Sequence, residues 1–215
     1  MTDIRPYTPA DRDDVLTVCH KTGYFGEDAS EHFKDAVLFG TILVSYYIDT
    51  EPENAFVAVD GDRTVGYIVG TPDTLAQKEA FDEAVMPKIL RRLFTSTLFR
   101  HPKDALFLLG LRGYENFEET LYAENLLDHY PAHLHINLLA GYQRRGLGET
   151  MIRTFEDHMR KRRVPGIHLV TSTLNTKAVP FYEKLGYAVV RELPNFLWDK
   201  KSPADTKSLV FAKKL

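Results

Sequence analysis

The amino-acid sequence predicts one α/β domain built on a parallel or mixed sheet. In the C-terminal third, short apolar runs alternate with amphipathic stretches, which is typical of strands joined by crossover helices. A length of 215 residues is enough to bury a sizeable core and favours a single domain, 1–215. The segment 73–131 interrupts the strands and is expected to be a helical insertion.

The N-terminal half is predicted to start with a strand and a helix and to end in a hairpin. Thr8 suits the cap of the first helix, and Pro9 suits its first position, where no backbone N–H is needed. Asp60-Gly61 between two β-branched runs is a strong hairpin signal. The predicted elements are a strand ending at Arg5, helices at 9–20 and 31–47, and hairpin strands at 56–59 and 65–69.

Apolar periodicity predicts the remaining elements. A helix at 79–94 carries apolar residues on one face, and Pro87 is expected to kink or split it. Pro165-Gly166 and Gly186 are expected to end two later helices. The other predicted elements are helical stretches at 105–111 and 117–127, strands at 133–140, 167–171, 187–190 and 208–212, and helices at 147–163 and 176–185.

Composition narrows the class of protein. The formal net charge of -3 argues against a general nucleic-acid binder. The sequence has no apolar run long enough to span a bilayer, and its first residues lack the apolar core of a signal peptide. Cys19 is the only cysteine, which excludes an internal disulfide and a multi-thiolate zinc site. We therefore expect a monomeric or homodimeric protein of the cytoplasm or nucleus, without membrane or nucleic-acid partners.

A glycine-bearing turn at 143–148 is the most informative segment. It follows a predicted strand and opens a predicted helix, so its backbone N–H groups would converge where the helix dipole adds positive charge. Gly146 and Gly148 would let a phosphate approach closely, although they could simply allow a tight turn. The turn therefore predicts a site for a phosphorylated cofactor.

A second cluster of residues lies at 175–187, about thirty residues after the turn. Asn175 precedes a predicted helix and could simply cap it. Ala178, Tyr182 and Leu185 recur at helical spacing, so Tyr182 could be a core aromatic whose hydroxyl reaches solvent.

The turn and this cluster together resemble the GNAT superfamily of acyl-CoA N-acyltransferases, on Gln-Arg-Arg-Gly-Leu-Gly at 143–148 and Phe-Tyr-Glu-Lys-Leu-Gly-Tyr at 181–187. The resemblance implies a mixed, mostly antiparallel sheet flanked by helices, with acetyl-CoA as co-substrate. In that family the turn binds the cofactor pyrophosphate, and the preceding strand contacts the pantetheine arm. The cofactor-binding residues that it implies are Leu138, Ala140, Gln143, Arg144, Arg145, Gly146, Leu147, Gly148, Asn175, Phe181, Tyr182 and Lys184.

The resemblance also places Tyr182 near the thioester sulfur as a general acid. A tyrosine pKa near 10 lies above a thiol pKa near 8.5, so full proton transfer in water is uphill by about 2 kcal/mol. We therefore expect Tyr182 to stabilise the developing thiolate by a hydrogen bond.

Two histidines, His133 and His135, fall on the same side of the strand before the turn. Such imidazoles can take up the amine proton, and the pair resembles that of arylalkylamine N-acetyltransferases. Tyr-Pro-Ala-His-Leu-His at 130–135 also resembles the acetyltransferase-like segment of O-GlcNAc hydrolases and their bacterial relatives. Either histidine could instead be a core residue held by backbone groups. Many GNAT enzymes carry a glutamate on this strand, so which histidine is the base stays open.

Other polar residues give weaker signals. Glu27 and Asp28 lie in a loop that GNAT enzymes often place near the acceptor, where they could attract a cation or simply be solvated. We expect no metal site, because Pro131 between His129 and His133 prevents a shared helical face.

These expectations combine into one predicted function, namely transfer of an acetyl group from acetyl-CoA to a primary amine by direct attack in a ternary complex. The catalytic residues would be Tyr182, His133 and His135. The alternative is a non-catalytic module that binds acyl-CoA or another protein, because a fold does not guarantee an activity.

Overall fold

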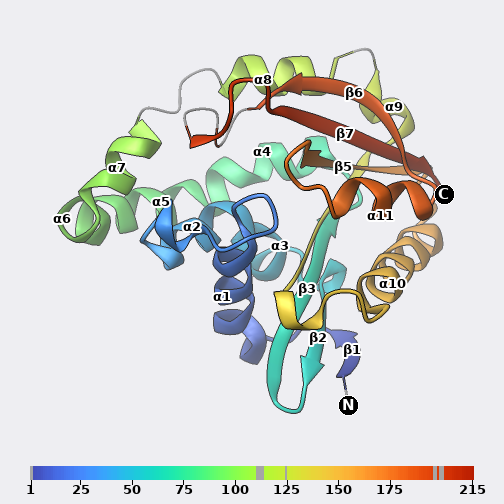
Figure 1. The fold of residues 1–215 in the computed structure, drawn as a ribbon, viewed down its shortest axis with the longest axis horizontal. Helices are drawn as coiled ribbons and strands as arrows, with labels where there is room; N and C mark the ends of the chain where they lie inside the picture. The colour runs from blue at the N-terminus through green and yellow to red at the C-terminus, as the bar shows by residue number, and fades with distance from the viewer. Residues whose placement is uncertain (1, 110–113, 124, 196–197, 199–200) are drawn as a thin grey trace.

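Seven strands of the described chain form one twisted sheet in the order β1-β2-β3-β4-β5-β7-β6 (Figure 1). The computed structural model describes residues 2–109, 114–123, 125–195, 198 and 201–215. Every neighbouring pair of strands is antiparallel except β4 and β5. The strands are β1 Thr2–Pro6, β2 Phe56–Asp60, β3 Arg63–Thr71, β4 Ala132–Leu138, β5 Gly166–Ser172, β6 Ala188–Pro194 and β7 Lys207–Lys214. The fold is therefore mixed α/β with a mostly antiparallel sheet, as the family resemblance implied, and the parallel pairing expected from the strand–helix alternation is limited to β4 and β5.

The parallel pair β4–β5 is short and opens the middle of the sheet. These strands pair only at Ala132 with Ile167 and at His133 with His168. In contrast, β4 pairs with β3 over six residues, and β5 pairs with β7 over seven. Beyond His133 the two central strands diverge, so their facing edges are available to a ligand.

Helices cover both faces of the sheet and build two cores. On one face lie α1 Arg12–Thr22, α2 Ala36–Leu43 and α3 Ser45–Asp49, which pack with Tyr67 and Val69 of β3. On the other face lie α10 Leu147–Lys161 and α11 Ala178–Lys184, which pack with Leu134 of β4 and Phe211 of β7. Because side chains alternate along a strand, successive residues of β4 point into different cores.

The first helices differ from their predicted bounds. A 3-10 turn, η1 Pro9–Asp11, precedes α1, and the Asp11 carboxylate accepts bonds from the backbone N–H and hydroxyl of Thr8. The predicted helix at 31–47 is wrong at both its start and its middle. It begins at Ala36, because Asp35 caps it by accepting from Leu38 N–H, and it breaks at Val44 before α3 begins. Two 3-10 turns flank this region, η2 Ala29–Glu31 and η3 Pro52–Asn54.

Helices fill most of the segment between β3 and β4. The predicted split near Pro87 is confirmed, since Val85 separates α4 Thr74–Ala84 from α5 Met86–Arg92 and Pro87 lies in the first turn of α5. The other elements are a π-turn η4 Leu93–Thr97, α6 Leu98–Arg100, α7 Pro102–Leu109, α8 Tyr114–Leu121 and α9 Leu126–His129. Residues 110, 111 and 124 of the predicted stretches lie outside the described residues.

Buried carboxylates fix these helices to the N-terminal core. Asp104 of α7 accepts from the backbone N–H groups of Lys34 and Asp35, at 2.8 and 2.7 Å. The buried Asp35 carboxylate in turn accepts from Arg92, at 2.9 Å, and from the hydroxyl of Thr97, at 2.6 Å.

Within the described part of the chain, no helix is both long and apolar enough to cross a membrane.

Candidate active site

The glycine turn connects β4 to α10 through η5 Ala140–Tyr142 and two residues in the left-handed region. Arg144 has φ +60° and Gly146 has φ +81°, so the chain reverses sharply before Leu147 opens α10. In the described structure, the backbone N–H groups from Arg144 to Gly148 donate to no protein acceptor. Unpartnered donors at the start of a 15-residue helix are the arrangement that binds a phosphate or pyrophosphate.

The side chains of the turn have different tasks. Gln143 turns back and donates from Nε2 to the carbonyl of Leu138 at 3.0 Å, which ties the turn to the end of β4. Arg144 and Arg145 are exposed, and the Arg145 guanidinium lies over the ring of Tyr142, 5.2 Å from its centroid. The turn therefore presents positive charge to solvent while its backbone is held in place. Ala140 is exposed beside it.

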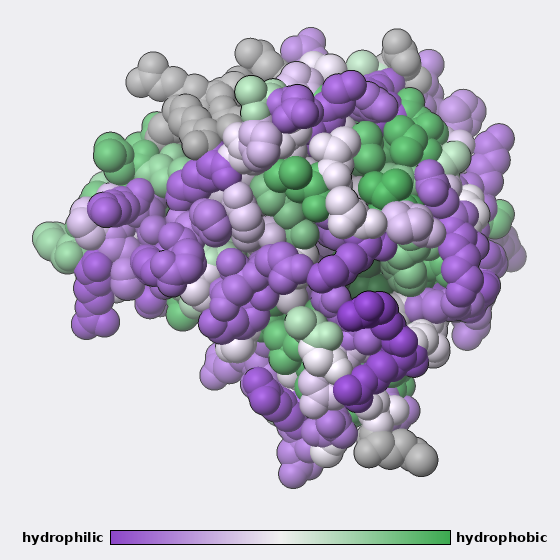
Figure 2. Space-filling view, viewed as in Figure 1, coloured by the Kyte–Doolittle hydropathy of each residue, from purple (hydrophilic) through white to green (hydrophobic). Residues whose placement is uncertain are grey.

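The second glycine of the turn is needed for packing. A Cβ at Gly148 would lie 3.2 Å from the Phe181 ring and 3.5 Å from Leu138, so a side chain there would push the Phe181 ring away by a few tenths of an ångström. Lys184 of α11 adds a bond to Glu149 at 3.3 Å. The predicted cofactor residues on α10 and α11 are thus in contact with one another. The space-filling view is hollowed beside these two helices (Figure 2).

Asn175 lies at the C-terminal side of β5, just before α11. Its backbone carbonyl accepts from Ala178 N–H at 2.9 Å, but its side chain caps no helix, and Lys177 is the residue at the cap position. The amide lies against Gly26, where a Cβ would approach it to 3.3 Å. In the described structure this amide has no hydrogen-bond partner, so it can bind the amide groups of a ligand.

Tyr182 is a buried aromatic residue of α11. Its ring contacts those of Phe181, Tyr187 and Phe211, with centroids 5.3, 6.0 and 5.6 Å apart. Desolvation raises the pKa of its hydroxyl, so Tyr182 stays protonated at neutral pH. Its hydroxyl donates to no acceptor among the described residues. A protonated and uncommitted hydroxyl can donate a hydrogen bond to a developing thiolate.

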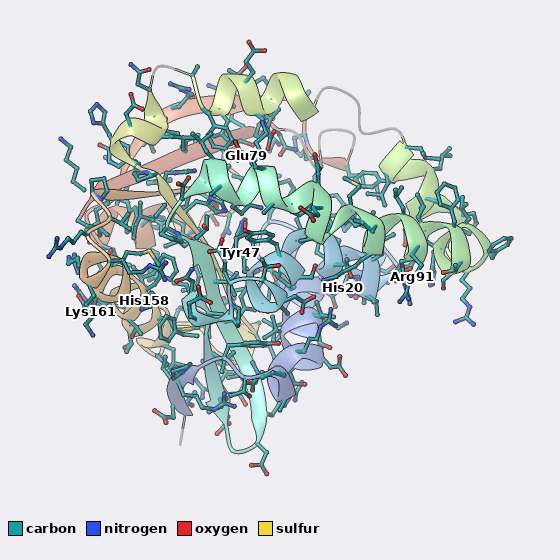
Figure 3. The ribbon with its side chains drawn as sticks, turned by 180° about the vertical axis from the view of Figure 1, so that it is seen from behind. His20, Tyr47, Glu79, Arg91, His158 and Lys161 are labelled. Atoms are coloured by element: carbon teal, nitrogen blue, oxygen red, sulfur yellow. The ribbon has the colours of Figure 1, made fainter. Side chains whose placement is uncertain are left out.

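His133 and His135 lie on the opposite face, next to α3 and the start of α4. The hydroxyl of Tyr47 lies between them, 2.6 Å from His133 Nε2 and 3.2 Å from His135 Nε2. Viewed from behind, Tyr47 lies between α4 and the sheet (Figure 3). His133 Nδ1 contacts the hydroxyl of Thr74 at 2.7 Å. The structure thus brings both predicted histidines together and adds two residues that the sequence did not indicate.

The two histidines differ in accessibility but share a low proton affinity. His133 is buried and His135 is exposed. Desolvation, followed by the neighbouring His168 and His135, holds the pKa of His133 well below its usual value. The protein atoms packed around the His135 ring desolvate it and, together with His168, lower its pKa to about 4, although the residue as a whole stays exposed to solvent. Both imidazoles are therefore neutral at pH 7, so each has one nitrogen that can accept a proton.

The loop with Glu27 and Asp28 carries paired rather than free charges. Glu27 lies 2.7 Å from Lys177, and Asp28 lies 2.8 Å from Lys21. Tyr24 and Glu27 exchange backbone hydrogen bonds, and Gly26 places the loop against Asn175. The described residues contain no group of three or more His, Cys, Asp or Glu that could hold a metal ion.

The fold is that of a class of enzyme, the acyl-CoA-dependent acyltransferases. Residues 24–187 match the family model described as Acetyltransferase (GNAT) family, and the chain belongs to this family. Acetyl-CoA is accordingly the co-substrate, and the fold indicates acyltransferase activity.

Solved structures agree with this membership. The crystal structure of SsHAT is 30% identical to this chain, with a TM-score of 0.78, and the match covers 99% of this chain and 98% of that one. A mutant agmatine N-acetyltransferase in its apo form shares the fold at 15% identity and a TM-score of 0.60, over 100% and 99% of the two chains. The ribosomal-protein-S18-alanine N-acetyltransferase of Escherichia coli shares it at 14% identity and a TM-score of 0.55, over 100% and 94%.

Proposed function

We propose that this protein is an N-acetyltransferase that moves the acetyl group of acetyl-CoA to a primary amine by direct attack in a ternary complex. The observation that carries the proposal is the opening between β4 and β5, which has different chemistry on its two faces. One face offers the unpartnered N–H groups of the turn and the Tyr182 hydroxyl. The other face offers the neutral histidines beside Tyr47.

The proposed cofactor site runs from the turn to Asn175. The pyrophosphate would lie on the backbone of Gln143 to Gly148, and the pantetheine arm would run along the end of β4 at Leu138 and past Ala140 of η5. Because the Leu138 carbonyl already accepts from Gln143, a pantetheine amide would share it as a second donor. Phe181 and Lys184 would flank the arm.

In the proposed reaction two protons leave the nitrogen of the acceptor, one before and one during formation of the N–C bond. An ammonium acceptor loses one proton to water, and the lone pair of the neutral amine then forms the N–C bond as the C–S bond breaks. A histidine takes up the second N–H proton as this bond forms and passes it to water, while the thiolate, whose charge the Tyr182 hydroxyl stabilises, takes a proton from water. Positioning and thiolate stabilisation would supply most of the rate enhancement.

The proposal is tested by calorimetry with acetyl-CoA and by thiol release on a panel of amines that includes protein lysines and N-termini. We expect saturable binding and amine-dependent release. Tyr182→Phe should lower kcat by about tenfold or more, because one hydrogen bond to the thiolate is lost, with cofactor affinity nearly unchanged. Tyr187→Phe is the matched control, since its buried hydroxyl lies on the neighbouring ring.

Two results would contradict the proposal in different ways. Binding of acetyl-CoA without turnover on any amine would favour a non-catalytic acyl-CoA-binding or protein-interaction module. A Tyr182→Phe variant with wild-type kcat would remove the acid role of Tyr182 but leave the acetyl transfer itself in place.

A further inference from the structure

A chain of four side-chain contacts in the candidate site ends at a backbone carbonyl, and this end fixes the direction of every hydrogen bond in it. The carbonyl of Pro131 lies 2.6 Å from the Thr74 hydroxyl and 2.9 Å from Thr74 N–H. A carbonyl can only accept, and a hydroxyl has a single proton. The proton of the Thr74 hydroxyl therefore points to Pro131.

The next contact sets the tautomer of His133. Thr74 Oγ1 lies 2.7 Å from His133 Nδ1, and with its own proton already donated it must accept there. His133 consequently carries its proton on Nδ1. In a neutral imidazole this leaves Nε2 as an acceptor, and Tyr47 donates its hydroxyl proton to it over 2.6 Å.

The last contact sets the tautomer of His135. The Tyr47 oxygen lies 3.2 Å from His135 Nε2, and because its proton is directed to His133 it accepts at this contact. His135 then carries its proton on Nε2, and its lone pair is on Nδ1. In the described structure that Nδ1 has no protein hydrogen-bond partner, and His135 is the exposed member of the pair.

We propose that His135 Nδ1 is the base that takes up the amine proton, and that Tyr47 is a positioning residue that holds His135 in the required tautomer. This inference rests on the proposed function. On proton uptake His135 becomes an imidazolium that still donates from Nε2 to Tyr47, and the proton on Nδ1 then passes to water.

The positive charge stays on His135 because the hydrogen bonds through Tyr47 cannot transfer a proton to the buried His133. Movement of a proton through Tyr47 would make His133 an imidazolium, but His133 is buried and its pKa is held well below the usual value by desolvation, His168 and His135. The Nδ1 of His168 is itself held by the carbonyl of Tyr130 at 2.7 Å. His133 is thus a fixed acceptor, and the base is at the solvent end.

The weak basicity of His135 also determines when the amine proton is removed relative to formation of the N–C bond. Its pKa of about 4 lies far below the value near 10.4 of an alkyl ammonium, so it cannot deprotonate the free ammonium efficiently. The nitrogen becomes much more acidic as the N–C bond forms. Proton removal by His135 therefore accompanies bond formation.

The direct test is a two-bond ¹⁵N–¹H correlation spectrum of histidine-labelled protein at pH 7.5 without substrate, which distinguishes the two neutral tautomers. His133→Gln and His135→Gln provide the assignments. We expect Nδ1–H for His133 and Nε2–H for His135. Tyr47→Phe should leave His133 unchanged and give a tautomer mixture at His135, whereas Tyr46→Phe, whose hydroxyl bonds Glu51 at 2.8 Å, should change neither.

Kinetics complete the test. His135→Gln should lower kcat by at least about 100-fold, and Tyr47→Phe by about three- to tenfold with KM nearly unchanged. Two results would overturn the inference even if the wild-type protein is fully active. One is an Nδ1–H tautomer of His135 in the wild type, and the other is a Tyr47→Phe variant with wild-type kcat and wild-type tautomers. Absence of turnover in the wild type would overturn the proposed function and the base role together, while the spectrum would still report the order of the hydrogen bonds.

Discussion

His168 shows how one buried imidazole can control the stability of this molecule. It lies in β5, almost fully buried, with Nδ1 bonded to the carbonyl of Tyr130. Desolvation lowers its pKa to about 4, although the backbone bonds oppose the shift. Between pH 6.5 and 4 the unfolded chain therefore binds more protons than the folded protein, so acid favours unfolding.

The expected consequence is a stability that is complete above about pH 6.5 and is lost as the pH falls toward 4. From pH 7.5 to 5, His168 alone should remove about 2 kcal/mol, with His133 acting in the same direction. Urea titrations at several pH values measure this slope. His168→Gln should be less stable at pH 7.5 but should flatten the slope, and the exposed His129→Gln should leave it unchanged. An unaltered slope in His168→Gln would refute the assignment.

Sequence spacing could identify only those residues of the candidate site that lie on the same strand or helix. His133 and His135 could be paired because alternation in a strand is local, and Tyr182 could be placed on a helix for the same reason. Tyr47 and Thr74 could not be found, since they precede His133 by 86 and 59 residues and belong to other elements. Only the packing of α3 and α4 on β4 brings them to the imidazoles.

At the scale of elements, α10, α11 and most strands were predicted close to their observed bounds, because apolar periodicity and glycine positions decide them, while β6 continues to Pro194, beyond its predicted end at 190. The bounds of the helix predicted at 31–47 were wrong, because the start of this helix depends on residues distant in the sequence. Asp104 satisfies the backbone N–H groups of Lys34 and Asp35, and Arg92 neutralises Asp35, so the helix begins at Ala36. Such tertiary capping leaves no local signal.

The turn before α10 permits a matched pair of variants. Gly146 and Gly61 both have positive φ, of +81° and +60°, and a Cβ on either meets nothing within 4 Å. Gly146→Glu should abolish acetyl-CoA binding, because it places a carboxylate where the proposed site holds the phosphates. Gly61→Glu, in the β2–β3 hairpin, should bind acetyl-CoA normally despite similar backbone strain. Calorimetry measures both affinities. Equal losses in the two variants would show that strain rather than charge is responsible.

At the scale of the whole molecule, the sheet consists of two parts, β1 to β4 and β5 to β7. These parts are joined by only two residue pairs, between β4 and β5. At the proposed site a cofactor would lie across this opening and contact both parts, and any ligand specific for the folded state adds stability. Acetyl-CoA at 100 times its Kd should contribute about 2.7 kcal/mol, which raises Tm by roughly 5–10 °C for a chain of this size. Scanning calorimetry with and without acetyl-CoA checks this, with Gly146→Glu as the variant that should not respond.

The short β4–β5 pairing also bears on how long the protein survives without its co-substrate. Proteins usually conceal unpaired strand edges, because an open edge is a template for pairing with another chain. Here two such edges face each other in the middle of the sheet, and local separation of its two parts would present both to a neighbouring molecule. We therefore expect the protein without acetyl-CoA to aggregate more readily, and the supply of acetyl-CoA to lengthen its lifetime.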